Sequence, residues 1–311
     1  MQQKKKEVTI AIEMIVISNR IGRRNKMFLM PLSNKIKLLK DEPLPLFYWS
    51  ERKFIFKDKE NYGDLLSEYL VEKISGTPVR WVHPKKQPWY KWNKMNYLAI
   101  GSIIHHATKD SVIWGSGIID QKQKTADADF RAVRGPRTRN YLLNLGYKCP
   151  PVYGDPALLL PLYFKPEEEK KYKLGIIPHY HDYKNVAKTY QDQTEILVID
   201  LMTLNVEEVT HEILQCEKTI SSSLHGLIVS HAYRTPCVWV EFSDKLFGDG
   251  IKFTDYMESV ELQVYQPQFL RERLSLEELE ELLNKFPAQP EWEVLERLQK
   301  DLLIACPFRS E

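Results

Sequence analysis

The sequence lacks the features that mark several large classes of protein. No apolar run approaches the roughly 20 residues that a membrane-spanning helix needs. The four cysteines lie far apart and form no C-x-x-C pair, so neither a zinc cage nor a disulfide framework is indicated; they are Cys149, Cys216, Cys237 and Cys306. Internal repeats, low-complexity segments, a P-loop and a complete G-x-G-x-x-G motif are also missing. We therefore expect a globular protein with reduced, buried thiols and no metal site.

Charge is unevenly distributed along the 311 residues. The net charge is +2, yet residues 1–40 hold ten Lys and Arg against two Glu, and the remainder holds 34 basic against 40 acidic residues. We expect a basic N-terminal extension that contacts an anionic membrane surface. A solvated extension, a start codon placed too early and nucleic-acid binding are the alternatives. The apolar run near the start contains a glutamate and no small-residue cleavage site, which predicts a cytoplasmic protein, with the inner face of the cell membrane as a second location.

Strand and helix patterns alternate through the first half of the chain. Strands or strand-to-loop transitions are expected at 43–50, 95–104, 110–120 and 152–161, and helices at 61–76 and 134–150. Asp64 lies near the start of the first helix and Gly76 at its end. Alternation of this kind predicts a parallel sheet with crossover helices.

A second alternation follows the charged stretch 165–173, which is the candidate linker. It contains strands in 173–182 and 195–200 and a helix in 205–216. The last part of the chain, 275–305, is predicted to form two acidic helices. The predicted division is 1–40 for the basic extension, 41–165 and 166–265 for N- and C-terminal Rossmann-like domains, and 266–311 for C-terminal helices. A cleft is expected between the two domains.

A histidine stands where the second alternation passes from strand to helix, in "KTISSSLHGLIVSHAYRTPCVWVEF" (218–242). Ser223 is a plausible N-cap, which puts His225 in the first helical turn with Gly226 leaving room beside it. The unpaired amides and positive dipole of that turn suit a phosphate or carboxylate. A histidine that only caps or packs the helix is the alternative.

Other loops carry weaker signals. Gly-Ser turns at 101–104 and 114–117 can bring backbone amides close to a ligand. Arg134 lies just before a helix start, where its guanidinium can fork onto a carboxylate or phosphate, although "RAVRGPRTR" also reads as a surface basic cluster. The two histidines of "HYHD" (179–182) have no third metal ligand nearby in sequence.

Seven short motifs occur in an order that resembles the polysaccharide pyruvyl transferase family: "NYGD", "GSII", "WGSG", "AVRGPRT", "YGDPALLLP", "IIPHYHD" and "SSSLHGLIVSHAYRTP". The resemblance covers roughly residues 44–245. It implies an α/β, GT-B-like fold with two Rossmann-like parallel-sheet domains facing a cleft. It also implies transfer of a pyruvyl group from phosphoenolpyruvate to a sugar of a bacterial capsule, exopolysaccharide or lipid-linked precursor. That chemistry forms a ketal, releases phosphate and requires no cofactor beyond phosphoenolpyruvate as co-substrate.

On this basis we assign expected roles. His225 and Asp64 are the expected catalytic residues. Asp64 could orient a sugar hydroxyl or act as a base. The alternative is that Asp64 is only a carboxylate at the start of a helix. Expected donor-binding residues are Arg134, Arg131, Ser221, Ser222, Ser223, Leu224, Gly115, Ser116 and Gly117. Expected acceptor-binding residues are Asn61, Tyr62, Gly101, Ser102, His105 and His179.

The chain departs from the family at one position. Many members resemble "SRLHG" at the histidine motif, whereas this chain has Ser223 where they have arginine. If that arginine holds donor phosphate, Arg134, Arg131 or the serine amides must replace it. Two other functions remain open: a GT-B-type glycosyltransferase that uses a nucleotide sugar, and a catalytically silent glycan-binding subunit.

Overall fold

The computed structural model describes residues 42–55, 57–244 and 249–308. The chain divides into two units, Met1–Pro43 and Leu44–Glu311, and both sheets belong to the second. The predicted basic extension and its membrane contact lie outside the described residues.

The first sheet has five strands in the order β3-β1-β4-β5-β6, and every neighbouring pair is parallel. The strands are β1 (Leu44–Phe47), β3 (Val79–Trp81), β4 (Asn96–Leu98), β5 (Ser111–Trp114) and β6 (Asp129–Ala132). Parallel pairing requires crossover connections, as the alternation in the sequence predicts. The sequence analysis did not foresee β6.

Helices α4 (Tyr62–Ser75) and α5 (Pro136–Asn144) flank this sheet, with α3 (Glu51–Phe54) after β1. The predicted ends of α4 are confirmed: the Asn61 side chain accepts the amide of Gly63, and Gly76 takes the left-handed conformation (φ 63°) that favours glycine. The expectation of a strand in 152–161 was wrong. There Tyr153 forms one isolated bridge, and the chain then enters η3 (Pro156–Leu159) and α6 (Leu160–Tyr163), because Asp155 followed by proline starts a helical turn.

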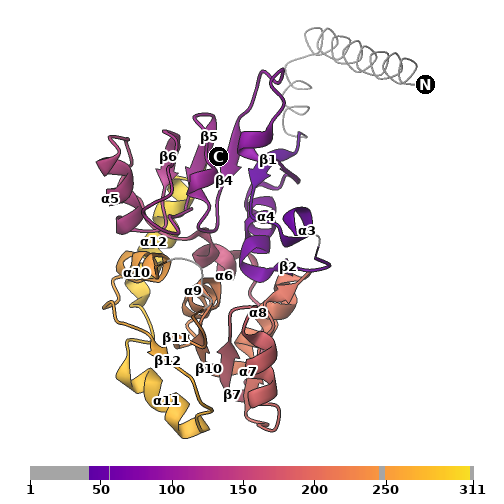
Figure 1. Ribbon diagram of the computed structural model, residues 1–311, viewed down its shortest axis with the longest axis vertical. Helices are drawn as coiled ribbons and strands as arrows, with labels where there is room; N and C mark the ends of the chain where they lie inside the picture. Colours follow the sequence, from indigo (N-terminus) through magenta and orange to yellow (C-terminus); the bar gives the residue numbers. More distant parts are fainter. Residues whose placement is uncertain (1–41, 56, 245–248, 309–311) are drawn as a thin grey trace, which may run out of the picture. The chain divides into compact units, whose positions relative to one another are not determined.

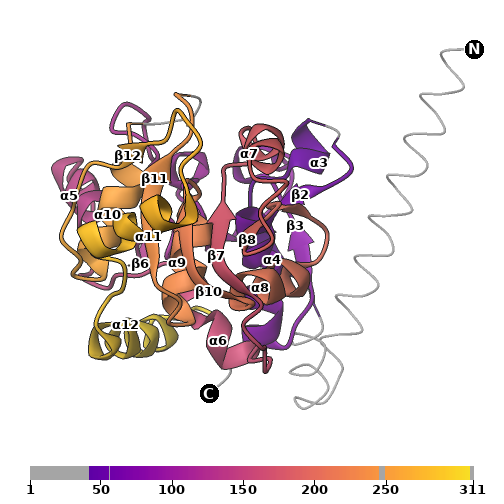
Figure 2. The ribbon, with the colours of Figure 1, turned by 90° about the horizontal axis from the view of Figure 1, so that it is seen from below.

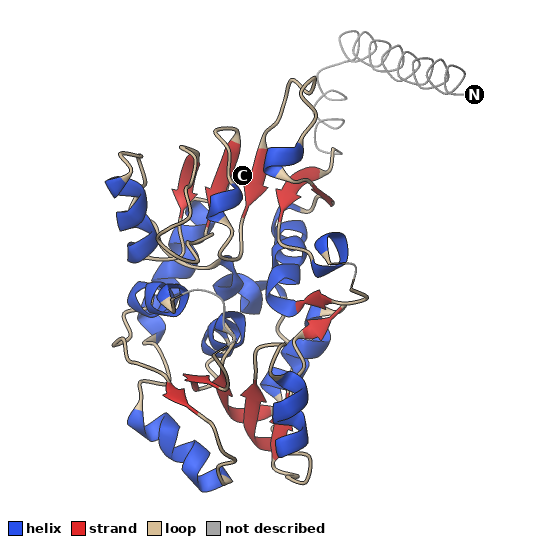
Figure 3. Cartoon of the chain, in the orientation of Figure 1, coloured by secondary structure: helices blue, strands red, loops and turns tan. Residues whose placement is uncertain are grey.

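The second sheet is also parallel, in the order β12-β11-β10-β7-β8. Its strands are β7 (Tyr172–Ile177), β8 (Ile196–Val198), β10 (Cys216–Ser221), β11 (Cys237–Glu241) and β12 (Gln268–Phe269). Its helices are α7 (Tyr183–Thr189), α8 (Val206–Leu214) and α9 (Leu224–Ala232). In Figure 3 the red strands of the two five-stranded sheets lie apart from each other, with blue helices between and around them. The chain is therefore an α/β protein with two Rossmann-like parallel sheets.

The C-terminal elements pack on both sheets and do not form a separate layer. Helix α10 (Ile251–Ser259), which the sequence analysis did not predict, packs on α5, and α11 (Leu276–Lys285) packs on β11. Helix α12 (Trp292–Ile304) returns to the first half, where the indole of Trp114 donates to the carbonyl of Leu302 (2.8 Å). In Figure 2 these three helices gather on the side of β11 and β12, opposite α7 and α8.

The two halves are joined by short polar contacts and by helices. Strands β2 (Glu60–Asn61) and β9 (Met202–Thr203) pair antiparallel, one from each half. The buried hydroxyl of Tyr62 lies 2.9 Å from Oγ1 of Thr210. Figure 1 shows α6 and α9 between the two sheets, in agreement with their mutual contacts and those of α9 with α4. The loops at the carboxyl ends of both sheets therefore meet.

Among the described residues no helix is both long and apolar enough to span a bilayer. The thiols of Cys149, Cys216 and Cys237 are free and buried, as expected. Burial raises the pKa of Cys149 to about 11, and those of Cys216 and Cys237 to about 12. These thiols belong to the cores of the two halves.

One fully buried ion pair joins the first sheet to α10. Nε of Arg134 lies 3.1 Å from Oδ2 of Asp255, and neither side chain has exposed surface. Asp255 also accepts the amide (3.0 Å) and the hydroxyl (2.7 Å) of Thr138, at the start of α5. Both ions are thus compensated by hydrogen bonds, which a buried pair requires.

We expect Asp255→Ala to lower the free energy of unfolding by about 3–5 kcal/mol, because it leaves the Arg134 guanidinium buried without its counter-ion. Urea denaturation measures the change. The control is Glu258→Ala, on the same helix, whose half-exposed pair with Arg137 should contribute less than about 1 kcal/mol. Equal losses in the two variants would show that the buried pair does not hold α10 in place.

Candidate active site

The three serines before His225 shape the turn that carries it. Oγ of Ser221 accepts the amide of Ser223 (3.0 Å), and Oγ of Ser222 accepts the amide of His179 (2.8 Å), which ties this turn to the loop after β7. Ser223 occupies the N-cap position, but its side chain makes no capping hydrogen bond. Leu224 follows as the first helical residue. The turn is therefore closed by Ser221, and the first-turn amides of α9 have no acceptor within the helix.

The imidazole of His225 faces a buried carboxylate. Its Nε2 lies 3.6 Å from Oδ2 of Asp155, with side-chain exposures of 13% and 0%. Neither atom has a hydrogen-bond partner within the described chain. The other oxygen of Asp155 accepts the amide of Ala157 and so caps η3, which packs against α9. The motif "YGDP" thus supplies a carboxylate to the histidine, a role that the sequence analysis missed because the two residues are 70 positions apart.

Space for the imidazole comes from Gly63 and not, as expected, from Gly226. A Cβ atom at position 63 would lie 2.1 Å from Nδ1 of His225, so the ring packs directly on the start of α4. At Gly226 a Cβ atom would instead meet Oγ of Ser221 (2.5 Å) and Cγ2 of Ile177 (2.7 Å). Gly226 is therefore needed for the packing of α9 on its own sheet. His225 is consequently held between the two halves of the protein, with Nδ1 directed towards the first.

Asp64 lies next to Gly63, in an acidic environment. Burial, followed by the carboxylates of Glu51 and Glu60, raises the pKa of Asp64 well above its usual range. Lys252 has the opposite, smaller effect on this pKa. A Cβ atom at Gly101 would stand 4.0 Å from Oδ1 of Asp64, so "NYGD" and "GSII" lie side by side.

Lys252, on the first turn of α10, was not foreseen from the sequence. Burial, followed by the nearby guanidinium of Arg134, lowers the pKa of Lys252 to about 8, while Asp64 raises it. Burial, with Lys252 as the second cause, lowers the pKa of His179 to about 3. The ammonium group therefore lies near Asp64 of the first half and His179 of the second. No motif in the sequence pointed to it, because a single lysine on an amphipathic helix is ordinarily a surface residue.

Arg134 affects the pKa of Lys252 and has no exposed surface. Besides Asp255, its guanidinium donates to Oγ of Ser102 (2.6 Å) and to the carbonyl of Ile118 (2.6 Å). A Cβ atom at Gly117 would lie 2.4 Å from its Cζ, which explains a glycine there. Its predicted contact with the donor stays a prediction. In this structure Arg134 positions the hydroxyl of Ser102 and contributes positive charge near Lys252.

The Gly-Ser turn after β5 is used for internal packing. The amide of Gly115 donates to the carbonyl of Ala132 and that of Gly117 to the carbonyl of Gly101. The hydroxyl of Ser116 donates to the carbonyl of Ala99 (3.0 Å). This turn brings the loops of three strands together, and its direct contact with a donor stays a prediction.

Among the described residues, no hydrogen bond, ion pair or ring contact joins the remaining candidates to His225. Arg131 is half-exposed on β6 and pairs with Asp129 (2.8 Å). The ring of His105 contacts that of His106 at a tilted angle (centroids 4.1 Å apart, planes at 42°), and burial, followed by Lys85, lowers the pKa of His105 to about 4. Asn61 and Tyr62 are engaged in the cap of α4 and in the junction between the halves. Their predicted substrate contacts stay predictions.

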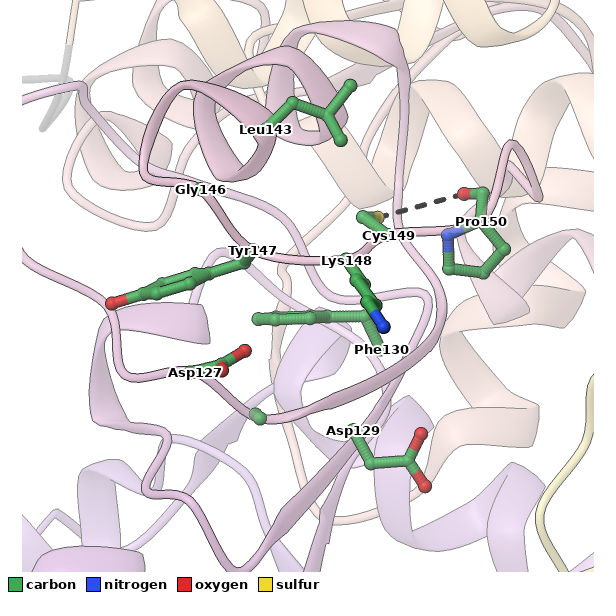
Figure 4. A pocket seen from close by; sticks show the side chains of 10 residues that line it. Asp127, Asp129, Phe130, Leu143, Gly146, Tyr147, Lys148, Cys149 and Pro150 are labelled. Atoms are coloured by element: carbon green, nitrogen blue, oxygen red, sulfur yellow. Dashed lines mark hydrogen bonds between the residues drawn. The ribbon is translucent and has the colours of Figure 1, made fainter.

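A separate pocket of about 870 Å³ lies between the segment before β6 and the end of α5. Figure 4 shows its lining, with Phe130, Tyr147 and Lys148 among the labelled side chains. None of the predicted site residues lines it. Within the described ranges no group of three or more His, Cys, Asp and Glu side chains is arranged to hold a metal ion.

Comparison with known proteins agrees with the motif order. A family model described as polysaccharide pyruvyl transferase matches residues 46–244. A curated relative, "Uncharacterized protein L143" of Acanthamoeba polyphaga mimivirus, is 33% identical over 204 residues, which are 63% of this chain and 70% of the relative. The matched family is one of transferases. The chain belongs to the polysaccharide pyruvyl transferase family, and membership implies a pyruvyltransferase that acts in polysaccharide synthesis.

The contact between Gly63 and His225 gives a direct test of the site. We expect Gly63→Ala to displace the imidazole and lower pyruvyl-transfer turnover by at least about 10²-fold, since a misplacement near 1 Å can have this effect. The control is Gly146→Ala, because nothing lies within 4 Å of a Cβ atom at that position. Its φ of +82° should make the alanine variant less stable by about 1–2 kcal/mol, and its turnover should be unchanged. A Gly63→Ala enzyme with full turnover would remove His225 from the reaction.

Proposed function

We propose that this protein transfers the pyruvyl group of phosphoenolpyruvate to two hydroxyls of one sugar, in a polysaccharide or its lipid-linked precursor, and releases phosphate. The observation that carries the proposal is the pair of His225 and buried Asp155 at the start of α9, next to Asp64 and Lys252. A GT-B-like arrangement, with the substrates bound where the carboxyl ends of the two sheets meet, is part of the proposal.

The donor is an anion with a phosphate and a carboxylate, and the site offers two kinds of group that suit it. The first is the amino end of α9, where unpaired amides and the helix dipole favour negative charge. The second is Lys252, whose ammonium lies near His179 at the same loops. Ser223 carries no charge where many family members have arginine, and we assign the missing positive charge to Lys252. Arg134 adds a second positive charge near Lys252.

The reaction needs one group that gives and takes a proton. We assign the proton exchange with the substrates to the imidazole of His225, whose Nε2 faces Asp155. Protonated His225 gives its proton to the methylene carbon of the donor, which becomes a methyl group, and a sugar hydroxyl attacks the resulting oxocarbenium-like carbon. Phosphate then leaves with the electron pair of its C–O bond. A second hydroxyl closes the ketal ring.

Each of the two sugar hydroxyls loses its proton when it forms a bond to the ketal carbon. One of these protons restores the imidazolium of His225, and the other leaves with phosphate or through Asp64. Asp64 suits this role because its raised pKa makes it a stronger base than an ordinary carboxylate. Asp155 is a positioning residue that fixes the orientation of the imidazole and stabilises its protonated form, as the carboxylate of a Ser-His-Asp triad does.

We expect His225→Ala to lower turnover by at least about 10²-fold and to leave phosphoenolpyruvate affinity largely unchanged, since general acid–base catalysis contributes about 10²–10⁴-fold. Calorimetric titration with phosphoenolpyruvate and with a panel of nucleotide sugars measures binding. His211→Ala, a half-exposed histidine paired with Glu168, is the control and should behave as wild type. Tighter binding of a nucleotide sugar than of phosphoenolpyruvate would refute the proposed donor.

The lowered pKa of Lys252 predicts how donor binding depends on pH. The lysine is charged below its pKa of about 8, so phosphoenolpyruvate affinity should fall as pH rises through 8. Lys252→Gln should lower affinity by about tenfold or more at neutral pH, the effect of losing a hydrogen bond from a charged group. Lys252→Arg should keep affinity constant to higher pH, because arginine does not deprotonate in this range. Lys109→Gln, at an exposed lysine, is the control; a similar fall in that variant would count against Lys252.

A further inference from the structure

The segment Lys85–Lys94, "KKQPWYKWNK", connects η1 (Pro84–Lys86) to β4 and exposes unusually large aromatic side chains. The exposed fractions are 88% for Trp89, 61% for Tyr90 and 99% for Trp92. An isolated exposed apolar residue needs no explanation, but three aromatic side chains within four residues mark an interaction surface. We call this segment the aromatic loop. In Figure 1 it is part of the purple chain that leads into β4.

The aromatic loop holds its rings outward by its own hydrogen bonds. The side-chain amide of Gln87 donates to the carbonyl of Lys94 (2.7 Å) and closes the base of the loop. The amide of Lys91 donates to the carbonyl of Pro88 (3.1 Å), which makes a turn at the tip, and the rings of Trp89 and Tyr90 meet edge to face with centroids 6.0 Å apart. The exposed rings are therefore presented by an ordered turn, and little order has to be gained when a partner binds.

The same segment carries four lysines and no acidic residue: Lys85, Lys86, Lys91 and Lys94. Residues 41–311 as a whole contain 34 Lys and Arg against 40 Asp and Glu, so this loop is more basic than that part of the chain on average. A long polyanion such as a nucleic acid would also contact the acidic remainder of the protein and be repelled by it. A flat anionic surface that contacts the loop alone would not meet this repulsion.

We propose that the aromatic loop docks this protein on an anionic membrane surface. Trp and Tyr rings place their apolar bodies at the level of the lipid headgroups and keep a polar edge in water. Each lysine near a surface of anionic lipids adds to the affinity, and this contribution is screened by salt. The contact is peripheral, and it rests on residues of the loop itself, independently of the proposed donor and acceptor.

The test is co-flotation of the full chain with phosphatidylcholine vesicles that contain or lack phosphatidylserine. We expect selective binding to the anionic vesicles, and at least about tenfold weaker binding after Trp89→Ala, Tyr90→Ala and Trp92→Ala are combined. Combined Lys→Gln changes at the four lysines should weaken the preference for phosphatidylserine. The control combines Leu204→Ala and Ile304→Ala, which are 61% and 72% exposed, and it should bind as wild type.

A second measurement reports on the tip directly. Lipids brominated near the headgroup should quench tryptophan emission of the wild-type protein, and the loss of Trp89 and Trp92 should remove most of that quenching. Retained flotation by the aromatic variant would overturn the proposal and assign any membrane contact to another segment. Tighter binding of single-stranded DNA than of vesicles, lost in the same variants, would also overturn it in favour of a nucleic acid.

Discussion

The buried ion pair of Arg134 and Asp255 is the contact on which the arrangement of the site depends. A guanidinium with no exposed surface is tolerated only because it is compensated on several sides, by Asp255, Ser102 and a backbone carbonyl. These partners lie on α10 and on loops of the first sheet, so one side chain fixes their mutual positions. Helix α10 in turn carries Lys252, and burial, followed by the same guanidinium, lowers the pKa of that lysine. A fully buried charge thus contributes to the electrostatics of the site.

Much of the fold was predictable because its strands and helices have clear periodicity and stop signals. The start of α4 at Asn61 and its end at Gly76 are encoded locally, and so is the turn before His225. The segment after Tyr153 misled the prediction, because a run of leucines reads equally well as a buried strand or a helical turn. Helix α10 was missed, since its pattern is short and its packing on α5 is a tertiary contact.

The candidate site was predicted less completely, for the reason that its key contacts join distant parts of the chain. His225 and Asp64 were identified from their own loops. Asp155 and Lys252 could not be assigned, because a helix-capping aspartate and a lone lysine have ordinary local explanations, and only the folded chain brings them near the histidine and the anion site. Gly63 illustrates the same limit: the absence of its side chain matters only because an imidazole from the other half occupies that space.

The contact of His225 with Gly63 also bears on how the protein becomes active as it folds. His225 belongs to one half, and Gly63, on which its ring packs, belongs to the other. The pairing of β2 with β9 also joins the two halves. The halves also share one large apolar core, and some contacts across the junction link residues more than 140 positions apart, such as Tyr62 and Thr210. Contacts of such long range are slow to form. We therefore expect the recovery of activity during refolding to depend on the docking of the halves as well as on the formation of each sheet.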